Sequence, residues 1–186
     1  MPLGSLWIPV IVSTIAVFLG SSIIHMALKY HKADYKSLPQ EEAVREALRK
    51  ADAAPGIYFT PYCADMKEMK NPEVMEKYAK GPVALLTVYP KGPVNLPKHL
   101  GLWLGFSVVV SFIAAFLASR TLQPDADGLQ VMRTTGILAF TAYGFSHVSD
   151  SIWKGQPWAN TARALLDALI YSLLTGLTFR LLWPAA

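Results

Sequence analysis

The sequence predicts an all-α integral membrane protein with four transmembrane helices and a small, loop-rich, mostly helical extramembrane insert between helices 1 and 2. Two observations lead to this fold class. Four apolar stretches of roughly 18–23 residues carry few charges, and an α-helix of that length crosses about 30 Å of hydrocarbon. One contiguous polar segment, rich in lysine and proline, separates the first stretch from the other three.

The composition agrees with a chain that is largely embedded in lipid. Of the 186 residues, 53% are hydrophobic and only 16% are charged, whereas a soluble domain averages about 25% charged residues. The expected elements are transmembrane helices at residues 6–28, 99–119, 131–149 and 161–183, and a cytoplasmic insert at residues 29–98.

The insert is expected to contain short elements. Ser37 is the predicted N-cap of an amphipathic helix, because proline follows in the first turn and glutamine comes three residues later. Its apolar spacing continues to Ala51, and Pro55–Gly56 stops it. Ile57–Phe59 and Val83–Tyr89 are rich in β-branched and aromatic residues, which favours strands. Between them, Asn71 is the expected cap of a short helix.

The distribution of basic residues predicts the orientation in the membrane. Lysines flank the insert and also lie between the third and fourth stretches, and the positive-inside rule assigns such segments to the cytoplasm. We therefore expect a multi-pass protein of the bacterial inner (cytoplasmic) membrane with both termini outside. The lysines concerned are Lys29, Lys32, Lys36, Lys91, Lys98 and Lys154.

The net charge of +4 does not indicate a nucleic-acid partner. Most of the 17 Lys and Arg residues lie within the insert, beside most of the 13 Asp and Glu residues. Such a mixture is typical of a solvated surface, and it lacks the basic stripe of a nucleic-acid interface. The expected partners are the lipid bilayer and other integral membrane protein subunits.

Small residues recur along the last three stretches at spacings that allow close helix packing. Flat ridges of this kind let helix backbones approach, which stabilises helix association in lipid. The residues concerned are Ser107, Ser111 and Ala115 in the second stretch, Gly136 and Gly144 in the third, and Ala168, Ser172 and Gly176 in the fourth.

A polar intramembrane cluster is expected at the inner ends of the third and fourth helices. His147 and Asp150 lie one turn apart, as do Arg163 and Asp167. An unpaired carboxylate at the depth of Asp167 would cost a few kcal/mol, so we expect Asp167 to pair with Arg163, helped by His147 or Tyr171. This cluster is either a structural clamp or the coupling site of a small proton- or ion-coupled transporter that uses Asp167.

Three histidines lie near the predicted cytoplasmic boundary and raise a second possibility. Two histidines facing each other across a bundle can ligate haem iron, and one can ligate a chlorophyll-type magnesium. His25 and His147 are the candidate haem or pigment ligands of an electron-transfer subunit, and His99 lies at a similar depth. The alternative is that each histidine is an interfacial polar residue.

Other motifs are weaker. Cys63, Met66 and Met69 are soft ligands that suit Cu(I), but copper sites generally present more sulfur. The sequence has no phosphate-binding glycine loop, paired Cys-x-x-Cys, His-Glu zinc pattern or nucleophile elbow. We therefore expect no catalytic and no metal site, no bound cofactor unless it is haem or a pigment, and a non-catalytic subunit or scaffold that packs against a larger membrane complex.

Overall fold

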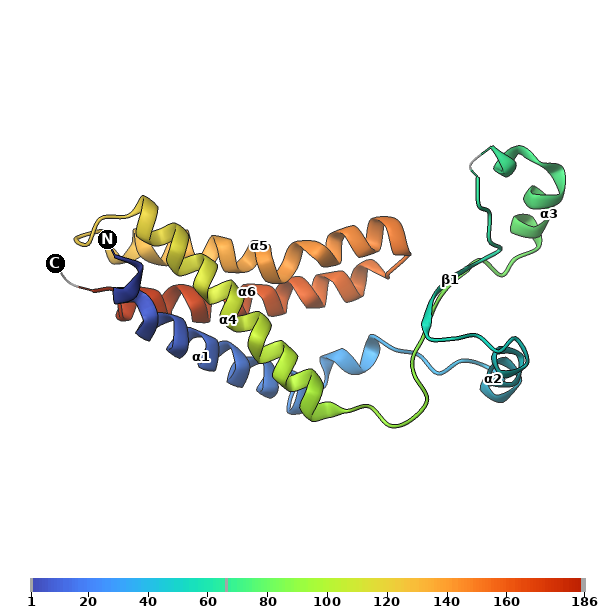
Figure 1. Ribbon diagram of the computed structural model, residues 1–186, viewed down its shortest axis with the longest axis horizontal. Coiled ribbons are helices and arrows are strands. Elements are labelled where there is room, and N and C mark those ends of the chain that lie inside the picture. Colours follow the sequence, from blue (N-terminus) through green and yellow to red (C-terminus); the bar gives the residue numbers. More distant parts are fainter. Residues whose placement is uncertain (1, 66, 185–186) are drawn as a thin grey trace. The chain divides into compact units, whose positions relative to one another are not determined.

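The computed structural model describes residues 2–65 and 67–184, and the chain divides into two compact units (Figure 1). The first, which we call the helical unit, contains residues up to 35 and from 95 onward. The second unit is Lys36–Val94. Residues 29–35, which the sequence analysis placed in the insert, thus belong to the helical unit, because their side chains bond to its last helix.

Four long helices build the helical unit, and their bounds are α1 Trp7–Met26, α4 Leu96–Thr121, α5 Gly128–Lys154 and α6 Trp158–Leu181. Among the described residues, three helices are long and apolar enough to span a membrane: α1 with the 3₁₀ turn η1 (Leu3–Leu6) before it, α4 and α6. These three indicate a lipid environment. Helix α5, which contains the predicted span 131–149, is as long but less apolar, and it carries Arg133, Asp150 and Lys154.

The helices begin and end where the local sequence dictates. The Asn95 side chain accepts a hydrogen bond from the Lys98 amide at 3.1 Å and caps α4. Asp127 caps α5 in the same way through the Leu129 amide at 3.0 Å. Gly155 ends α5 with a backbone φ of 69°, a left-handed conformation that glycine adopts without strain.

Helices α5 and α6 make the most extensive helix contact, through small residues. A Cβ atom added to Gly176 would lie 2.8 Å from the Met132 carbonyl oxygen and 3.5 Å from the Gly136 Cα. One added to Gly144 would lie 3.1 Å from the Ala168 Cβ. The backbones therefore approach too closely for larger side chains.

Helix α1 packs on α4 and α6. The Ser13 hydroxyl donates to the Ser111 hydroxyl at 3.0 Å, and both side chains are fully buried. Trp103 donates its indole N–H to the Ser21 hydroxyl at 2.8 Å. Of the remaining predicted packing residues, Ser107, Ala115 and Ser172 are also buried.

The end of the helical unit that contains both chain termini is closed by apolar side chains. We call this group the apolar-end cluster; it consists of Leu6, Ala114, Ala115, Ala118, Leu122, Val131 and Phe179. Trp183 packs against it and donates to the Gln123 carbonyl, so the chain ends and the α4–α5 turn lie together (Figure 1).

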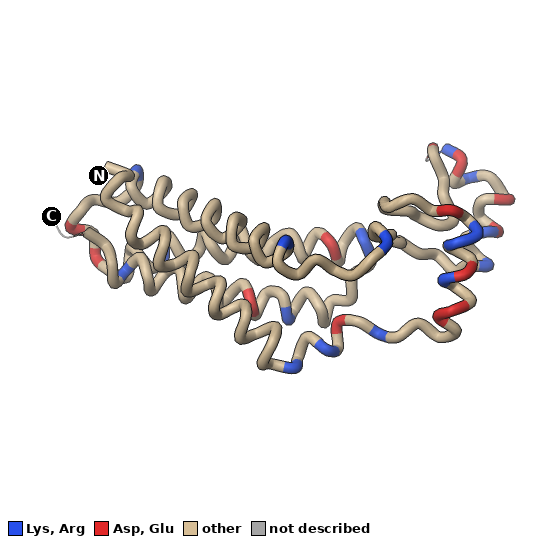
Figure 2. Tube along the Cα trace, turned by 60° about the horizontal axis from the view of Figure 1, so that its bottom comes forward, with Lys and Arg blue, Asp and Glu red and all other residues tan. Residues whose placement is uncertain are grey.

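The second unit combines two helices with a two-stranded antiparallel sheet. Its elements are α2 Glu41–Lys50, β1 Gly56–Thr60, η3 Glu68–Lys70, α3 Pro72–Lys80 and β2 Ala84–Val88. Tyr58 pairs with Leu86 in the middle of the sheet. No described residue of this unit is buried, and it holds most of the charged residues of the chain (Figure 2).

Two expected helix starts have different outcomes. The Asn71 cap is confirmed, since its side chain accepts from the Glu73 amide at 3.0 Å. The Ser37 cap is wrong, because α2 begins only at Glu41. Gln40 takes a left-handed backbone with φ of 53°, so the chain turns between Pro39 and the first helical residue.

Candidate functional site

A cavity of about 470 Å³ opens at the end of the helical unit opposite the termini. It collects side chains from the end of α1, the short turn that follows it, and α4, α5 and α6. Ionisable and hydroxyl groups are unusually frequent among its lining residues, which include His25, His31, Asp34, Tyr143, His147, Asp167 and Tyr171.

Asp167 on α6 is the most buried charged group of the site, with 5% of its surface exposed. The Tyr30 hydroxyl donates to one of its carboxylate oxygens, Oδ1. The His31 Nε2 lies 2.8 Å from the other oxygen, Oδ2. Both oxygens of the buried carboxylate therefore have partners, which relieves the cost of placing it inside the bundle.

His31 also links Asp167 to a second carboxylate. Its Nδ1 lies 2.6 Å from Asp34 Oδ2, and Arg163 donates from Nε to the other Asp34 oxygen at 2.5 Å. Asn160 completes the group by donating to the Asp34 carbonyl at 3.0 Å. We call Tyr30, His31, Asp34, Arg163 and Asp167 the polar-end cluster.

The local sequence explains how this cluster forms. Helix α1 ends at Met26, and the 3₁₀ turn η2, Tyr30–Ala33, follows directly. Side chains three residues apart lie over one another in a 3₁₀ turn, so His31 and Asp34 face the same way. On α6, Arg163 and Asp167 lie one helical turn apart and meet that face.

The charges of the cluster shift the acidities of the turn residues. Burial alone would raise the pKa of the Asp34 carboxyl, but the hydrogen bonds from His31 and Arg163 outweigh it and hold that pKa below its usual value. Burial and the hydrogen bond to Asp167 raise the pKa of the Tyr30 hydroxyl far above its usual value. Tyr30 therefore remains a neutral donor, and Asp34 remains an anion.

Aromatic side chains form the inner wall of the cavity. Trp103 lies 5.7 Å from Tyr143 and 5.8 Å from Tyr171, measured between ring centroids, and Phe106 meets Tyr143 edge to face at 5.6 Å. The Tyr143 hydroxyl is buried in this wall and interacts with the Ser107 side chain.

The structure brings some of the predicted site residues together and separates others. His25 and His147 line the same cavity, as does Asp167. Arg163 pairs with Asp34 and not with Asp167, because the turn after α1 folds back between them. Asp150 forms an ion pair with Lys154 at 2.7 Å and is not among the lining residues.

Three members of the cluster were missed from the sequence: Tyr30, His31 and Asp34. They lie in a short polar run that looked like the start of the insert. The spacing of His31 and Asp34, directly after an apolar stretch, was the only available indication. Of the weak copper candidates, the Cys63 thiol lies 3.0 Å from the Asp65 carbonyl oxygen, and Met66 lies outside the described residues.

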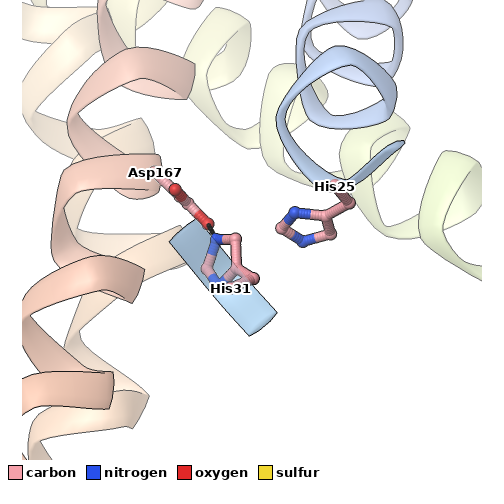
Figure 3. A group of neighbouring side chains, drawn as sticks. All are labelled: His25, His31 and Asp167. Atoms are coloured by element: carbon pink, nitrogen blue, oxygen red, sulfur yellow. Dashed lines mark hydrogen bonds and ion pairs between the residues drawn. The ribbon is translucent and has the colours of Figure 1, made fainter. Parts of the chain in front are cut away.

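Three side chains of the site present potential metal ligands to one another (Figure 3). One donor atom each from His25, His31 and Asp167 lie within 4.8 Å of one another. The His25 and His31 rings meet edge to face, with centroids 4.6 Å apart. Two imidazoles and a carboxylate form a donor set that transition-metal ions accept.

Comparison with known proteins does not supply a relative for this arrangement: no protein-family model, curated protein or solved structure matches the chain.

Proposed function

We propose that this chain is a non-catalytic subunit of a larger protein complex in the bacterial inner membrane. In this proposal α1, α4, α5 and α6 all span the bilayer, with the less apolar α5 shielded by its close packing on α6. Both termini lie outside, and the second unit lies in the cytoplasm, where the flanking lysines favour it.

The observation that carries the proposal is the lack of a core in the second unit. No described residue between 36 and 94 is buried, although the unit contains aromatic side chains that exceed 70% exposure, among them Tyr62 at 78% and Tyr89 at 75%. A unit of this size normally needs a hydrophobic core or another surface to keep its fold. A partner protein would supply that surface.

A hollow on the second unit indicates the chemistry of such a partner. Its volume is about 590 Å³, and Leu48, Val88 and Tyr89 form an apolar part of its wall. Arg45, Arg49 and Lys91 add basic groups to the same wall and Asp52 adds an acidic one, and both arginines pair with Glu42. We infer a partner segment with an apolar side chain and with an acidic one that can pair with Lys91.

Site-specific crosslinking in the native membrane tests this proposal. A photo-crosslinking residue at position 62 or 89 should give a covalent adduct with the same partner protein. The yield of that adduct should fall when Leu48→Asp is introduced into the same chain. Position 125, in the turn at the opposite end of the helical unit, provides the matched control and should not reach that partner. A stable, solitary monomer of 20.4 kDa in mild detergent, with no adduct at either position, would overturn the proposal.

The orientation is testable separately through the only cysteine. Cys63 lies in the second unit and is partly accessible. A membrane-impermeant maleimide should label it only after the inner membrane is opened, whereas a cysteine placed at Asp125 in a Cys63→Ser background should react in intact cells. Labelling of Cys63 in intact cells would show that the orientation is the opposite of the one proposed.

A second candidate function is that of a haem- or pigment-ligating electron-transfer subunit. It is favoured by one observation: His25 and His147, from α1 and α5, line the same cavity. Purified protein should then absorb in the Soret or pigment region and lose that band on His25→Ala or His147→Ala. A colourless complex would reject this function.

Ion-coupled transport through Asp167 has less support. Both Asp167 oxygens have partners, and the hydrophobic core at the opposite end of the bundle is the apolar-end cluster. A transport path generally needs polar groups through the whole bilayer. Proton or ion flux into liposomes that contain the parent protein, and its loss in the Asp167→Asn variant, would support this function.

A further inference from the structure

We propose that His25, His31 and Asp167 bind a divalent transition-metal ion at the polar end of the helical unit. This site is independent of the partner-binding role proposed above, since it lies within the helical unit.

The donor atoms lie close to the spacing that a single ion needs. A metal ion about 2.1 Å from each of several tetrahedral ligands holds those ligands about 3.4 Å apart. The His31 Nε2 and Asp167 Oδ2 atoms are 2.8 Å apart, and all three donors lie within 4.8 Å. The His25 side chain projects toward the other two from the end of α1 (Figure 3), so binding requires that His31 and Asp167 separate slightly and that His25 moves closer to them.

The surrounding hydrogen bonds present the correct atoms to that ion. When His31 donates its Nδ1–H to Asp34, its Nε2 lone pair becomes the free ligand atom. Arg163 holds the other Asp34 oxygen and so fixes the ring orientation through the carboxylate. Histidine ligands of metal ions almost always have such a carboxylate or carbonyl partner behind them.

Tyr30 plays the corresponding role for the carboxylate ligand. Its hydroxyl donates to Asp167 Oδ1, which leaves Oδ2 for the ion. Asp34 and Tyr30 are thus positioning residues: they touch the ligands and not the ion.

Metal binding requires the lone pair of His31 Nε2. A proton on that atom would leave to solvent through the cavity, and the Nδ1–H bond to Asp34 would remain. The coordination bonds that form are from His25, His31 Nε2 and Asp167 Oδ2 to the metal, and no oxidant or reductant is needed.

The donor set selects the class of ion. Magnesium and calcium prefer oxygen ligands, so two imidazoles argue against both. Zinc, iron, cobalt and nickel accept imidazole with carboxylate. The cavity of about 470 Å³ beside the site leaves room for water to fill the remaining coordination positions.

The test is a metal titration of the full-length protein in detergent, stripped with chelator and carrying Cys63→Ser to remove the thiol. Co²⁺ should bind at one equivalent per chain with visible ligand-field absorption, and Zn²⁺ should displace it. His25→Ala leaves the Tyr30, His31 and Asp167 bonds in place and should weaken binding by more than the roughly 10–100-fold that loss of an outer partner costs. Asp34→Asn should weaken it within that range.

His99→Ala is the matched control, because His99 lies at the start of α4 and is not among the cavity residues. It should leave the Co²⁺ affinity and spectrum unchanged. The inference is overturned if no stoichiometric binding occurs, if His25→Ala binds as tightly as the parent protein, or if only His147→Ala abolishes binding. The cluster would then be a metal-free ionic clamp or a different ligand site.

Discussion

The two ends of the helical unit are built from the same four helices but held together by different interactions. At the end with the termini, the apolar-end cluster buries Leu6, Val131 and Phe179 completely. At the other end, two carboxylates and three histidines line a cavity of about 470 Å³, and Arg163 pairs with one of those carboxylates. One end is filled by packing, whereas the other keeps open space beside buried charge.

The difference shows which interactions the fold needs. Close packing drives helix association in lipid, and the apolar-end cluster achieves it with apolar side chains alone. Buried charges are weak contributors to net stability, since their desolvation offsets most of their attraction. The polar end therefore points to a role other than stability, and the following predictions test that separation.

The largest effect is expected at the apolar end, from Phe179→Ala. Phe179 is the largest fully buried side chain, and its removal leaves a cavity next to Val131 and Ala118. Comparable truncations in soluble cores cost about 3–5 kcal/mol, and we expect the lower part of that range in detergent. Thermal unfolding should show a clearly lowered midpoint, and added Zn²⁺ should not restore it. An unchanged midpoint would mean that this end does not stabilise the bundle.

Gly176→Ala should have the next largest effect. The added methyl group would lie 2.8 Å from the Met132 carbonyl oxygen, which the helix backbone holds in place. Overpacking of this kind costs about 1–3 kcal/mol. The control is Gly105→Ala on α4, where an added Cβ meets no described atom within 4 Å. Equal unfolding midpoints of the two variants would contradict the close approach of α5 and α6.

Asp34→Asn should act locally at the polar end. It removes the charge that binds both His31 and Arg163, and charge-assisted hydrogen bonds of this type contribute about 1.5–3 kcal/mol each. In a Cys63→Ser background, alkylation of Ala164→Cys, at a half-buried position in the cavity wall, should become several-fold faster. Alkylation of Asp125→Cys, at the other end, should not change. Equal acceleration at both positions would indicate global unfolding instead.

Tyr143→Phe should have the smallest effect. Its buried hydroxyl makes no hydrogen bond of good geometry among the described residues and interacts only weakly with the Ser107 side chain, so its removal should change the unfolding midpoint by the equivalent of no more than about 1 kcal/mol. A marked loss of stability would show that this hydroxyl makes a strong hydrogen bond in the purified protein.

The sequence predicted the helical character of the chain from the length and apolarity of its long stretches. Apolar length depends only on local composition, so α1, α4 and α6 were recognisable. The start of α2 was not, because the left-handed backbone of Gln40 has no reliable sequence pattern.

The candidate site was predicted only in part. Asp167 and His25 were identified from their depth, but their contacts depend on how the chain continues beyond α1. Tyr30, His31 and Asp34 lie more than 120 residues before Arg163 and Asp167 in the chain, as the sequence separations of 129 to 137 residues across their hydrogen bonds show. Pairings over such separations are set by tertiary folding, which local patterns do not encode.

The anchored turn after α1 also determines the reach of the second unit. Arg163 holds Asp34, and the second unit begins at Lys36. If the contacts that anchor this turn were lost, the segment from Ala27 to Tyr35 would become part of the linker between α1 and the second unit. At roughly 3.3–3.6 Å per extended residue, it would lengthen that linker by up to about 30 Å. The contacts of Tyr30, His31 and Asp34 with α6 thereby set how far the linker to the second unit can extend.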